Sequence, residues 1–192
     1  MRQEIEIEYK NLLEEEEYLK LRHLYFTDKQ KPVTQKNYYF DTNNFTLKKN
    51  HCALRIRLKE AYAELTLKTP FEGHHTETTL DLEYEDAIKM IDSESFELPG
   101  EIVDVLNKEN ISVDPIVFLV GSLKTERLES IGSHVIIVLD KSYYADQIDY
   151  ELEIESDTKA IGEDLFKRIL KDNAIPVRPT LNKIARAFKA GS

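Results

Sequence analysis

Apolar and polar residues alternate with a period of two along most of the chain, which is the pattern of half-buried β-strands. Residues 4–10, EIEIEYK, are the first example, because glutamates occupy every second position and apolar or aromatic residues lie between them. Turn-like residues separate most of the alternating segments, as expected for consecutive antiparallel strands. We predict eight strands, over residues 3–10, 35–42, 52–59, 63–69, 76–84, 116–130, 134–145 and 147–156.

Other stretches have the spacing of amphipathic helices. Residues 11–25 begin with Asn11 as a candidate cap, Glu14 at the capping-box position and further acidic residues that suit a first helical turn. We predict helices over residues 11–25, within 93–110 and over about 158–173, ahead of a C-terminal stretch at 178–190. Strands joined in sequence and interrupted by helices predict an α+β chain, mainly antiparallel β, folded as a closed eight-stranded β-barrel in one domain over residues 1–192.

The alternation also shows which charged side chains share one face of a strand, because every second side chain points the same way. The shared faces carry Glu4, Glu6, Glu8 and Lys10; Arg55, Arg57 and Lys59; Glu64, Thr66 and Lys68; and Glu151, Glu153 and Glu155. The simplest interpretation of any one such strand is a face turned to solvent. However, the charges separate by strand, whereas a solubilising face usually mixes both signs. With helices available to cover the apolar faces, we predict that the charged faces line the lumen of the barrel.

A charged lumen needs a ligand, because clustered like charges repel one another and desolvated charges need partners. Carboxylate oxygens bind Mg²⁺ or Mn²⁺, and guanidinium and ammonium groups bind phosphate oxygens. A metal-bound polyphosphate would satisfy both sets of side chains at once.

Composition narrows the class of partner and the setting. The 192 residues carry a formal net charge of −10, which argues against nucleic acid and anionic membranes as partners because both favour a basic face. Cys52 is the only cysteine, which suits a reducing compartment. The first residues lack the apolar stretch of a signal peptide, and no run approaches the length of a membrane helix. We therefore expect a cytoplasmic protein.

The motif EIEYK, with Glu6, Glu8 and Lys10, resembles the N-terminal ExExK signature of the CYTH domain superfamily, also called triphosphate tunnel metalloenzymes. Further motifs follow in the order that this family has: YFDT (39–42), LRIR (54–57), LTLK followed by Thr69 and Pro70 (65–70), Arg127 in KTERLE, Asp140 in VLDKS, YELEIE (150–155) and Lys183 in TLNKIARA. Because the motifs span nearly the whole chain in order, they form a much stronger signal than ExExK alone. The length is similar to that of the short bacterial branch of the family.

The resemblance implies an eight-stranded antiparallel barrel whose tunnel binds a triphosphate together with Mg²⁺ or Mn²⁺. It implies metal ligation by Glu6, Glu8, Asp140, Glu151 and Glu153, and phosphate binding by Lys10, Arg55, Arg57, Lys68, Arg127 and Lys183. It also implies catalytic roles for Glu6, Glu8 and Lys10, joined by Tyr39, which falls where some members have a tyrosine near the reacting phosphate. Glu155 extends the second acidic run by one step, so the choice of ligands within that run stays open.

Three functions are compatible with these residues. The leading hypothesis is a divalent-metal-dependent hydrolase of triphosphates, first of all inorganic triphosphate, in which water attacks in line. Because a minority of the family makes cyclic AMP, an adenylyl cyclase is the alternative within enzymes. The third hypothesis is a non-catalytic module that binds polyphosphate or a nucleotide. Two acidic strands argue against it, because binding alone needs fewer metal-binding carboxylates. In each case the partner is a small-molecule triphosphate, and the sequence leaves open whether the chain is a monomer or a homodimer.

Overall fold

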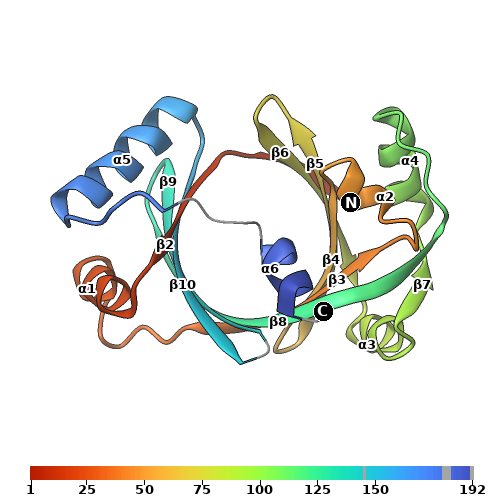
Figure 1. Ribbon diagram of the computed structural model, residues 1–192, viewed down its shortest axis with the longest axis horizontal. Coiled ribbons are helices and arrows are strands. Elements are labelled where there is room, and N and C mark those ends of the chain that lie inside the picture. Colours follow the sequence, from red (N-terminus) through yellow and green to blue (C-terminus); the bar gives the residue numbers. More distant parts are fainter. Residues whose placement is uncertain (145, 179–182, 191–192) are drawn as a thin grey trace. The chain divides into compact units, whose positions relative to one another are not determined.

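The computed structural model of the protein describes residues 1–144, 146–178 and 183–190 (Figure 1). The strands are β1 (Arg2–Glu6), β2 (Glu8–Leu13), β3 (Val33–Asp41), β4 (Ala53–Lys59), β5 (Tyr62–Phe71), β6 (His74–Leu82), β7 (Ser95–Glu97), β8 (Ile116–Ile131), β9 (Val135–Tyr144) and β10 (Gln147–Ser156). The helices are α1 (Glu15–Tyr25), α2 (Thr46–Lys49), α3 (Tyr84–Asp92), α4 (Gly100–Lys108), α5 (Lys159–Asp172) and α6 (Lys183–Ala190). None of the helices in the described ranges has the length and apolar character needed to cross a membrane.

The chain forms two compact units, and β3 and β8 contribute residues to both. The first unit contains residues 1–5, 36–123 and those from Ile184 onwards, and the second contains residues 6–35 and 124–183.

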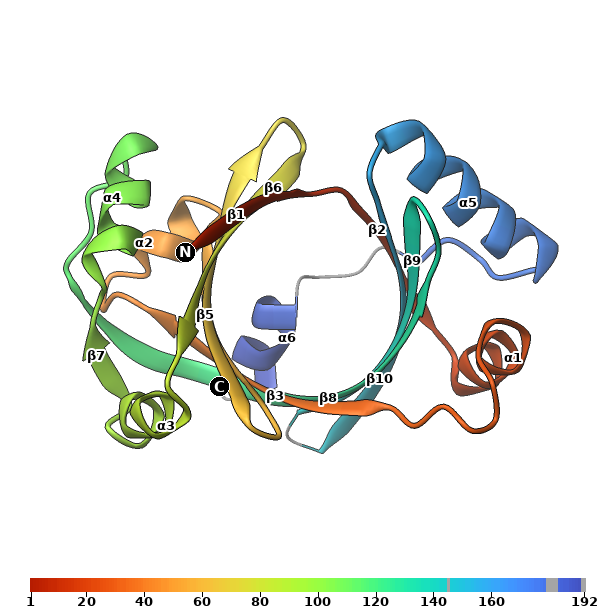
Figure 2. The same ribbon diagram turned by 180° about the vertical axis from the view of Figure 1, so that it is seen from behind.

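In the first unit the strand order is β1-β6-β5-β4-β3-β8, with the short β7 paired to β8. The pairings of β4 with β3 and β5, and of β5 with β6, are antiparallel. Alternate residues of β4 and β5 are apolar and fully buried, among them Ile56 and Leu65. They share a hydrophobic core with residues of α2, α3 and α4, which Figure 2 shows beside these strands. The opposite face of the same strands therefore carries their charged residues.

In the second unit the strand order is β8-β9-β10-β2, and all three pairings are antiparallel. Helices α1 and α5 lie beside β2 and β10 on one side of the strands (Figure 1). The core between them includes Leu139, Leu152 and Ile154 of the strands and Leu21 and Ile169 of the helices. Here too one face of the sheet is apolar and covered by helices, and the other is charged.

All eight predicted strands are present, and the α+β, mainly antiparallel fold is confirmed. The predicted first strand is interrupted at Ile7, which separates β1 from β2, and β7 adds a three-residue strand that the alternation did not indicate. The predicted helices within 93–110 and over 158–173 correspond to α4 and α5. Ala145 and residues 179–182, which fall within a predicted strand and the predicted C-terminal stretch, lie outside the described residues.

The predicted start of the first helix was wrong, because β2 continues through Leu13 and α1 begins at Glu15. Asn11 does not cap this helix. Its buried side chain donates hydrogen bonds to the carbonyls of Leu12 (2.8 Å) and Pro176 (3.1 Å), and it accepts one from the backbone N–H of Arg178 (2.7 Å). The amide thus anchors the segment after α5, and the helix is capped instead by a Glu14–Glu17 capping box.

Helices α2 and α3 were not predicted, and Tyr84, the first residue of α3, had been included in the strand over 76–84. The four residues of α2 are too few to show a helical period. Asp41 stabilises its start, because the carboxylate accepts hydrogen bonds from the backbone N–H groups of Leu47 (2.9 Å) and Lys48 (3.0 Å).

Candidate active site

The charged face of the second unit brings together side chains from four adjacent strands. They are Glu8 and Lys10 of β2, Glu151, Glu153 and Glu155 of β10, Asp140 of β9 and Arg127 of β8. The register places Arg127 and Glu151 opposite Asp140, and Glu153 opposite Lys10. Antiparallel partners project to the same side, so these residues form one cluster, which we call the acidic cluster.

Arg127 lies at the centre of the acidic cluster with a side chain that is 10% exposed. Its guanidinium donates to both oxygens of Asp140, from Nε to Oδ1 (2.8 Å) and from Nη2 to Oδ2 (2.7 Å). Nη2 also donates to Oε2 of Glu153 (2.6 Å), and Nη1 lies 3.6 Å from Glu155. Burial would lower the pKa of Arg127, but the charges of Asp140 and Glu153 raise it well above its ordinary value. The guanidinium is therefore a permanent cation within the cluster.

Lys183, the first residue of α6, adds a second cation to the acidic cluster. Its ammonium Nζ lies 2.7 Å from Oδ2 of Asp140 and 3.8 Å from Oε2 of Glu151, and it donates a short hydrogen bond to Oε1 of Glu153. Burial would raise the pKa of Asp140, but the charges of Arg127 and Lys183 hold it below its ordinary value. Arg127 and Lys183, both predicted to bind phosphate, therefore contact residues that were predicted to bind metal.

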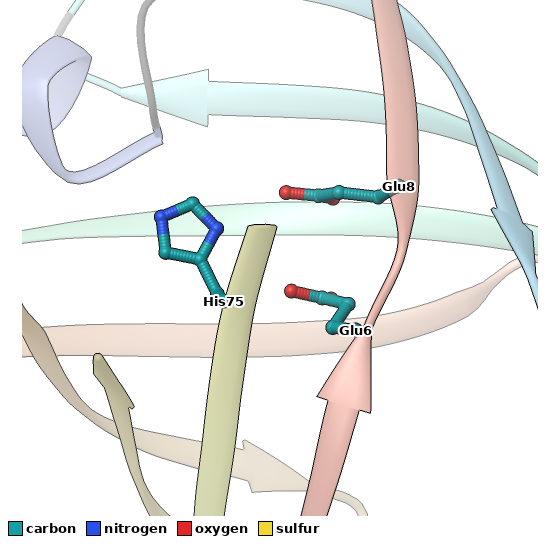
Figure 3. A group of neighbouring side chains, drawn as sticks. All are labelled: Glu6, Glu8 and His75. Atoms are coloured by element: carbon teal, nitrogen blue, oxygen red, sulfur yellow. The ribbon is translucent and has the colours of Figure 1, made fainter. Parts of the chain in front are cut away.

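Glu6 and Glu8 project from the N-terminal segment towards the same side (Figure 3). One carboxylate oxygen of each lies within 4.8 Å of the other. Lys10 donates a hydrogen bond to Oε1 of Glu8 (2.6 Å), and the side chain of Glu8 is 9% exposed. The carboxylates of the ExExK motif thus lie close together, and the ammonium of Lys10 lies beside that of Glu8.

Glu155 lies opposite Glu8 in the β2–β10 register, so two carboxylates occupy a position where like charges repel. Burial, together with the charges of Glu153, Glu6 and Glu8, raises the pKa of Glu155 to about 7 in spite of the nearby Arg127. The acidic cluster therefore contains more negative charge than its lysines and arginine balance. An additional cation would relieve this repulsion.

The donor atoms of the acidic cluster are of the type that hard divalent cations bind. Carboxylate oxygens are the ligands that Mg²⁺ and Mn²⁺ prefer; the cluster has them on Glu8, Asp140, Glu151 and Glu153, and Glu6 places an oxygen within 4.8 Å of one of Glu8. Arg127 and Lys183 bind the carboxylates of Asp140 and Glu153, and Lys10 donates to Glu8. A divalent cation would compete with these side chains for the same oxygens.

The charged face of the first unit gathers the remaining predicted residues, Arg55 and Arg57 of β4, Lys68 of β5 and Tyr39 of β3. Tyr39 lies directly opposite Arg55 and is 5% exposed. Arg57 donates from Nε to Oδ1 of Asn37 (2.9 Å), its partner in the register. Arg55 is 9% exposed, and its Nε is buried with no hydrogen-bond partner among the residues that the structure describes. A buried guanidinium with unused hydrogen-bonding capacity favours an anionic ligand.

Two carboxylates of the first unit, to which the sequence assigned no role, lie among these cations. Glu77 lies opposite Lys68, and its carboxylate is 2.7 Å from the ammonium. Burial would raise the pKa of Glu77, but the charges of Lys68 and Arg55 lower it to about 2. Glu64 lies near both arginines, at 3.5 Å from Arg57 and 4.0 Å from Arg55. The alternation placed Glu64 on this face, but nothing in the sequence indicated its contacts.

Comparison with known proteins identifies the family. Residues 4–188 match the family model of the CYTH domain. The chain therefore belongs to the CYTH family. One relative of this CYTH protein, "Putative triphosphatase YjbK" of Bacillus subtilis (strain 168), is 40% identical over 196 residues, covering 98% of this chain and 97% of the relative.

Solved structures of the CYTH family share the fold. The crystal structure of a "putative adenylate cyclase" from Bacillus halodurans is 37% identical, with a TM-score of 0.87 and coverage of 98% of this chain and 100% of that one. A Hippeastrum protein, named as an adenylyl cyclase with a dominant triphosphatase activity, is 24% identical with a TM-score of 0.73. The match covers 97% of this chain and 95% of that one. At that identity the likeness shows the fold alone. The CYTH fold implied by the sequence motifs is confirmed.

Proposed function

We propose that this CYTH protein hydrolyses triphosphate substrates, with inorganic triphosphate as the preferred one, in a reaction that depends on Mg²⁺ or Mn²⁺. The observation that carries the proposal is the buried guanidinium of Arg55, whose Nε has no hydrogen-bond partner among the described residues. Family membership supports the reaction class, as does the name of the relative at 40% identity.

The cations of the first unit are suited to phosphate oxygens. Arg55 and Arg57 occupy alternate positions of β4, so their guanidinium groups project to the same side, and Lys68 adds an ammonium on the neighbouring strand. Guanidinium groups bind phosphate oxygens through pairs of charge-assisted hydrogen bonds. These three residues would therefore fix the substrate and neutralise its charge, which is the main requirement of phosphoryl transfer. Tyr39, opposite Arg55, would contact the reacting phosphate.

The acidic cluster of the second unit is suited to the cation. Glu6 and Glu8 would be the principal ligands of this cation. Asp140, Glu151 and Glu153 would complete the ligand set once the cation replaces Lys183 and Arg127 as their partner. A divalent cation supplies charge neutralisation at phosphate oxygens and orients water. Lys10, Arg127 and Lys183 would turn from these carboxylates to the phosphate oxygens when substrate is bound.

In the proposed reaction a water oxygen attacks the terminal phosphorus in line with the anhydride bond. The new P–O bond forms as the anhydride bond breaks, and pyrophosphate leaves with the electron pair. The proton of the attacking water passes to a carboxylate of the acidic cluster and then to solvent. The products are phosphate and pyrophosphate.

The test is an assay of the purified protein with inorganic triphosphate, thiamine triphosphate, ATP and GTP, each with Mg²⁺ or Mn²⁺. We expect phosphate release that is fastest with inorganic triphosphate and absent with excess chelator. Formation of cyclic nucleotide from ATP would favour instead the cyclase suggested by the name of the Bacillus halodurans structure. Binding without turnover of any substrate would overturn the proposal in favour of a binding module.

Two variants test the assigned roles. Glu6→Gln should abolish turnover at saturating Mg²⁺ while the protein still melts cooperatively. Glu4→Gln is the matched control, because Glu4 is in phase with Glu6 but lies outside the motif and is exposed. Arg57→Ala should lower the efficiency of hydrolysis through weaker phosphate binding. Near-normal hydrolysis by Glu6→Gln or Arg57→Ala would contradict the role of the residue changed.

The cellular location and the domain organisation are also part of the proposal. The single cysteine, Cys52, is buried and suits the cytoplasm, as the sequence predicted. One family match over residues 4–188 supports treating the two units as parts of a single CYTH domain.

A further inference from the structure

Glu64 is a buried carboxylate at the centre of the first unit's charged face. It belongs to β5, its side chain is 7% exposed, and it lies opposite Arg57 on β4 and Asp81 on β6. An ionised carboxylate at such a position needs compensating partners, because desolvation is costly. Its two oxygens have different partners.

Oε1 of Glu64 faces the two arginines proposed to bind phosphate. It lies 3.5 Å from Nη1 of Arg57 and 4.0 Å from Nη2 of Arg55. These distances exceed the 2.7–2.9 Å or so of a charge-assisted hydrogen bond, yet are short enough for strong electrostatic attraction at a buried site. Glu64 therefore attracts both guanidinium groups without occupying their N–H donors through these contacts.

Oε2 of Glu64 is held from the other side. Nη2 of Arg2 donates to this oxygen at 3.3 Å, and the hydroxyl oxygen of Tyr62 lies 3.2 Å from it. Asp81 in turn accepts hydrogen bonds from the same hydroxyl (2.5 Å) and from Nη1 of Arg2 (3.1 Å). The second oxygen of the carboxylate is thus held by Arg2 and Tyr62, which Asp81 binds in turn.

We propose that Glu64 is a positioning residue, which holds Arg55 and Arg57 side by side in the geometry that receives one phosphate group of the substrate. Two neighbouring guanidinium groups at a buried site repel each other, and a carboxylate close to both offsets that repulsion before substrate arrives. Because the attraction is longer than a hydrogen bond, a phosphate oxygen need not break a bond to Glu64 in order to bind. This inference rests on the proposed triphosphatase function.

Glu64→Gln removes the negative charge of the side chain and keeps its shape. The amide oxygen can still accept from Arg2, but the neutral side chain no longer attracts both arginines, so they separate and meet the transition state poorly. We expect kcat/KM for inorganic triphosphate to fall about tenfold, mainly through kcat, because misplaced donors are felt most strongly in the transition state. Tyr62→Phe, which removes the hydroxyl beside Oε2 together with its hydrogen bond to Asp81, should cause a smaller loss of about threefold in the same direction.

A double-mutant cycle separates positioning from a general structural role. If Glu64 acts through Arg57, Glu64→Gln should have less than a twofold further effect in an Arg57→Ala background. The same change in a Lys68→Ala background should retain more of its effect than in the Arg57→Ala background, because Lys68 pairs with Glu77 at 2.7 Å. Asp81→Asn is the matched control for the network, since Asp81 binds Arg2 and Tyr62 but has a side chain that is 63% exposed. The kcat/KM of this variant should stay within twofold of the wild type.

The outcomes distinguish the two proposals. If the wild type is active and both Glu64→Gln and Tyr62→Phe stay within twofold of it, the positioning role is wrong but the triphosphatase function is not. The same holds if the effects of Glu64→Gln and Arg57→Ala add. Wild-type protein that hydrolyses no triphosphate would overturn the proposed function, and the role of Glu64 with it. Tyr62→Phe keeps the test valid if Glu64→Gln does not fold, because Tyr62 is 37% exposed.

Discussion

The ammonium Nζ of Lys183 lies 2.7 Å from Oδ2 of Asp140, a carboxylate with no exposed surface. It also contacts Glu151 and Glu153, so the lysine occupies the side of the acidic cluster that supplies three of the proposed metal ligands. A protein cation and a metal ion cannot use the same oxygens at full strength. Lys183 therefore stabilises the carboxylates, and it would compete with the proposed metal ion for them.

The first prediction is that Lys183→Met binds Mn²⁺ about tenfold more tightly than the wild type, because a competing cation is removed. The variant without metal should be less stable, since Asp140 and Glu153 lose a partner, and Mn²⁺ should restore its Tm. Titration calorimetry with Mn²⁺ alone measures the affinity, so substrate turnover does not enter. Lys124→Met is the control, because Lys124 is half exposed and pairs with Glu126. Unchanged or weaker Mn²⁺ binding by Lys183→Met would show that the lysine does not compete.

Arg127 gives the second prediction, which concerns stability. Its guanidinium is the bidentate partner of Asp140 and also binds Glu153, and all three side chains are at least nine-tenths buried. Removing one member of such a group leaves buried charges without compensation, at a cost of about 3–5 kcal/mol. Arg127→Met should therefore lower the free energy of unfolding by about 3 kcal/mol in urea denaturation.

The control for this change is Arg168→Met. Arg168 pairs with Asp164 one helical turn away at 3.5 Å, and both side chains are mostly exposed. Exposed pairs of this kind contribute at most about 0.5 kcal/mol. A loss below 1 kcal/mol for Arg127→Met would mean that the buried carboxylates find other partners.

The sequence predicted which side chains of the site share a face within a single strand. A period of two fixes which residues share a face, so Arg55 and Arg57, and likewise Glu151 and Glu153, were placed together from the sequence alone. Register between strands was not available, because it depends on turns and on long-range packing. Only the structure therefore shows that Glu8 of β2 lies opposite Glu155 of β10, since most of the chain separates these two strands.

The same limit explains the errors in the elements. Asn11 has the chemistry of a helix cap, and its sequence neighbours suit a first turn, but its partners are the backbone groups of Pro176 and Arg178. Tertiary hydrogen bonds that join positions over 160 residues apart override a local preference of about 1 kcal/mol. Helix α2 depends in a similar way on the carboxylate of Asp41.

Gly162 of α5 gives the third prediction. A Cβ atom at this position would lie 2.2 Å from Oγ of Ser156 and 2.8 Å from Cε2 of Tyr9, so the helix packs closely on β10 and β2. Alanine is favoured over glycine in a helix by about 1 kcal/mol, but overpacking of this kind costs about 1–3 kcal/mol. Gly162→Ala should therefore lower the Tm in a thermal melt. Gly100→Ala is the control, because nothing lies within 4 Å of its Cβ; a higher Tm for Gly162→Ala would contradict the close packing.

The last prediction concerns alkaline pH. Burial, with smaller contributions from the carboxylates of Glu109 and Asp41, raises the pKa of the Cys52 thiol to about 11 from 9.0. Between these values the unfolded chain loses the thiol proton while the folded protein keeps it, so stability falls as pH rises. A pKa difference of about 2 corresponds to about 3 kcal/mol of stability lost between pH 9 and 11. Urea denaturation of wild type and Cys52→Ala across this range should show a steeper decline in the wild type, since other groups titrate in both. Parallel declines would mean that the thiol ionises in the folded protein as readily as in the unfolded chain.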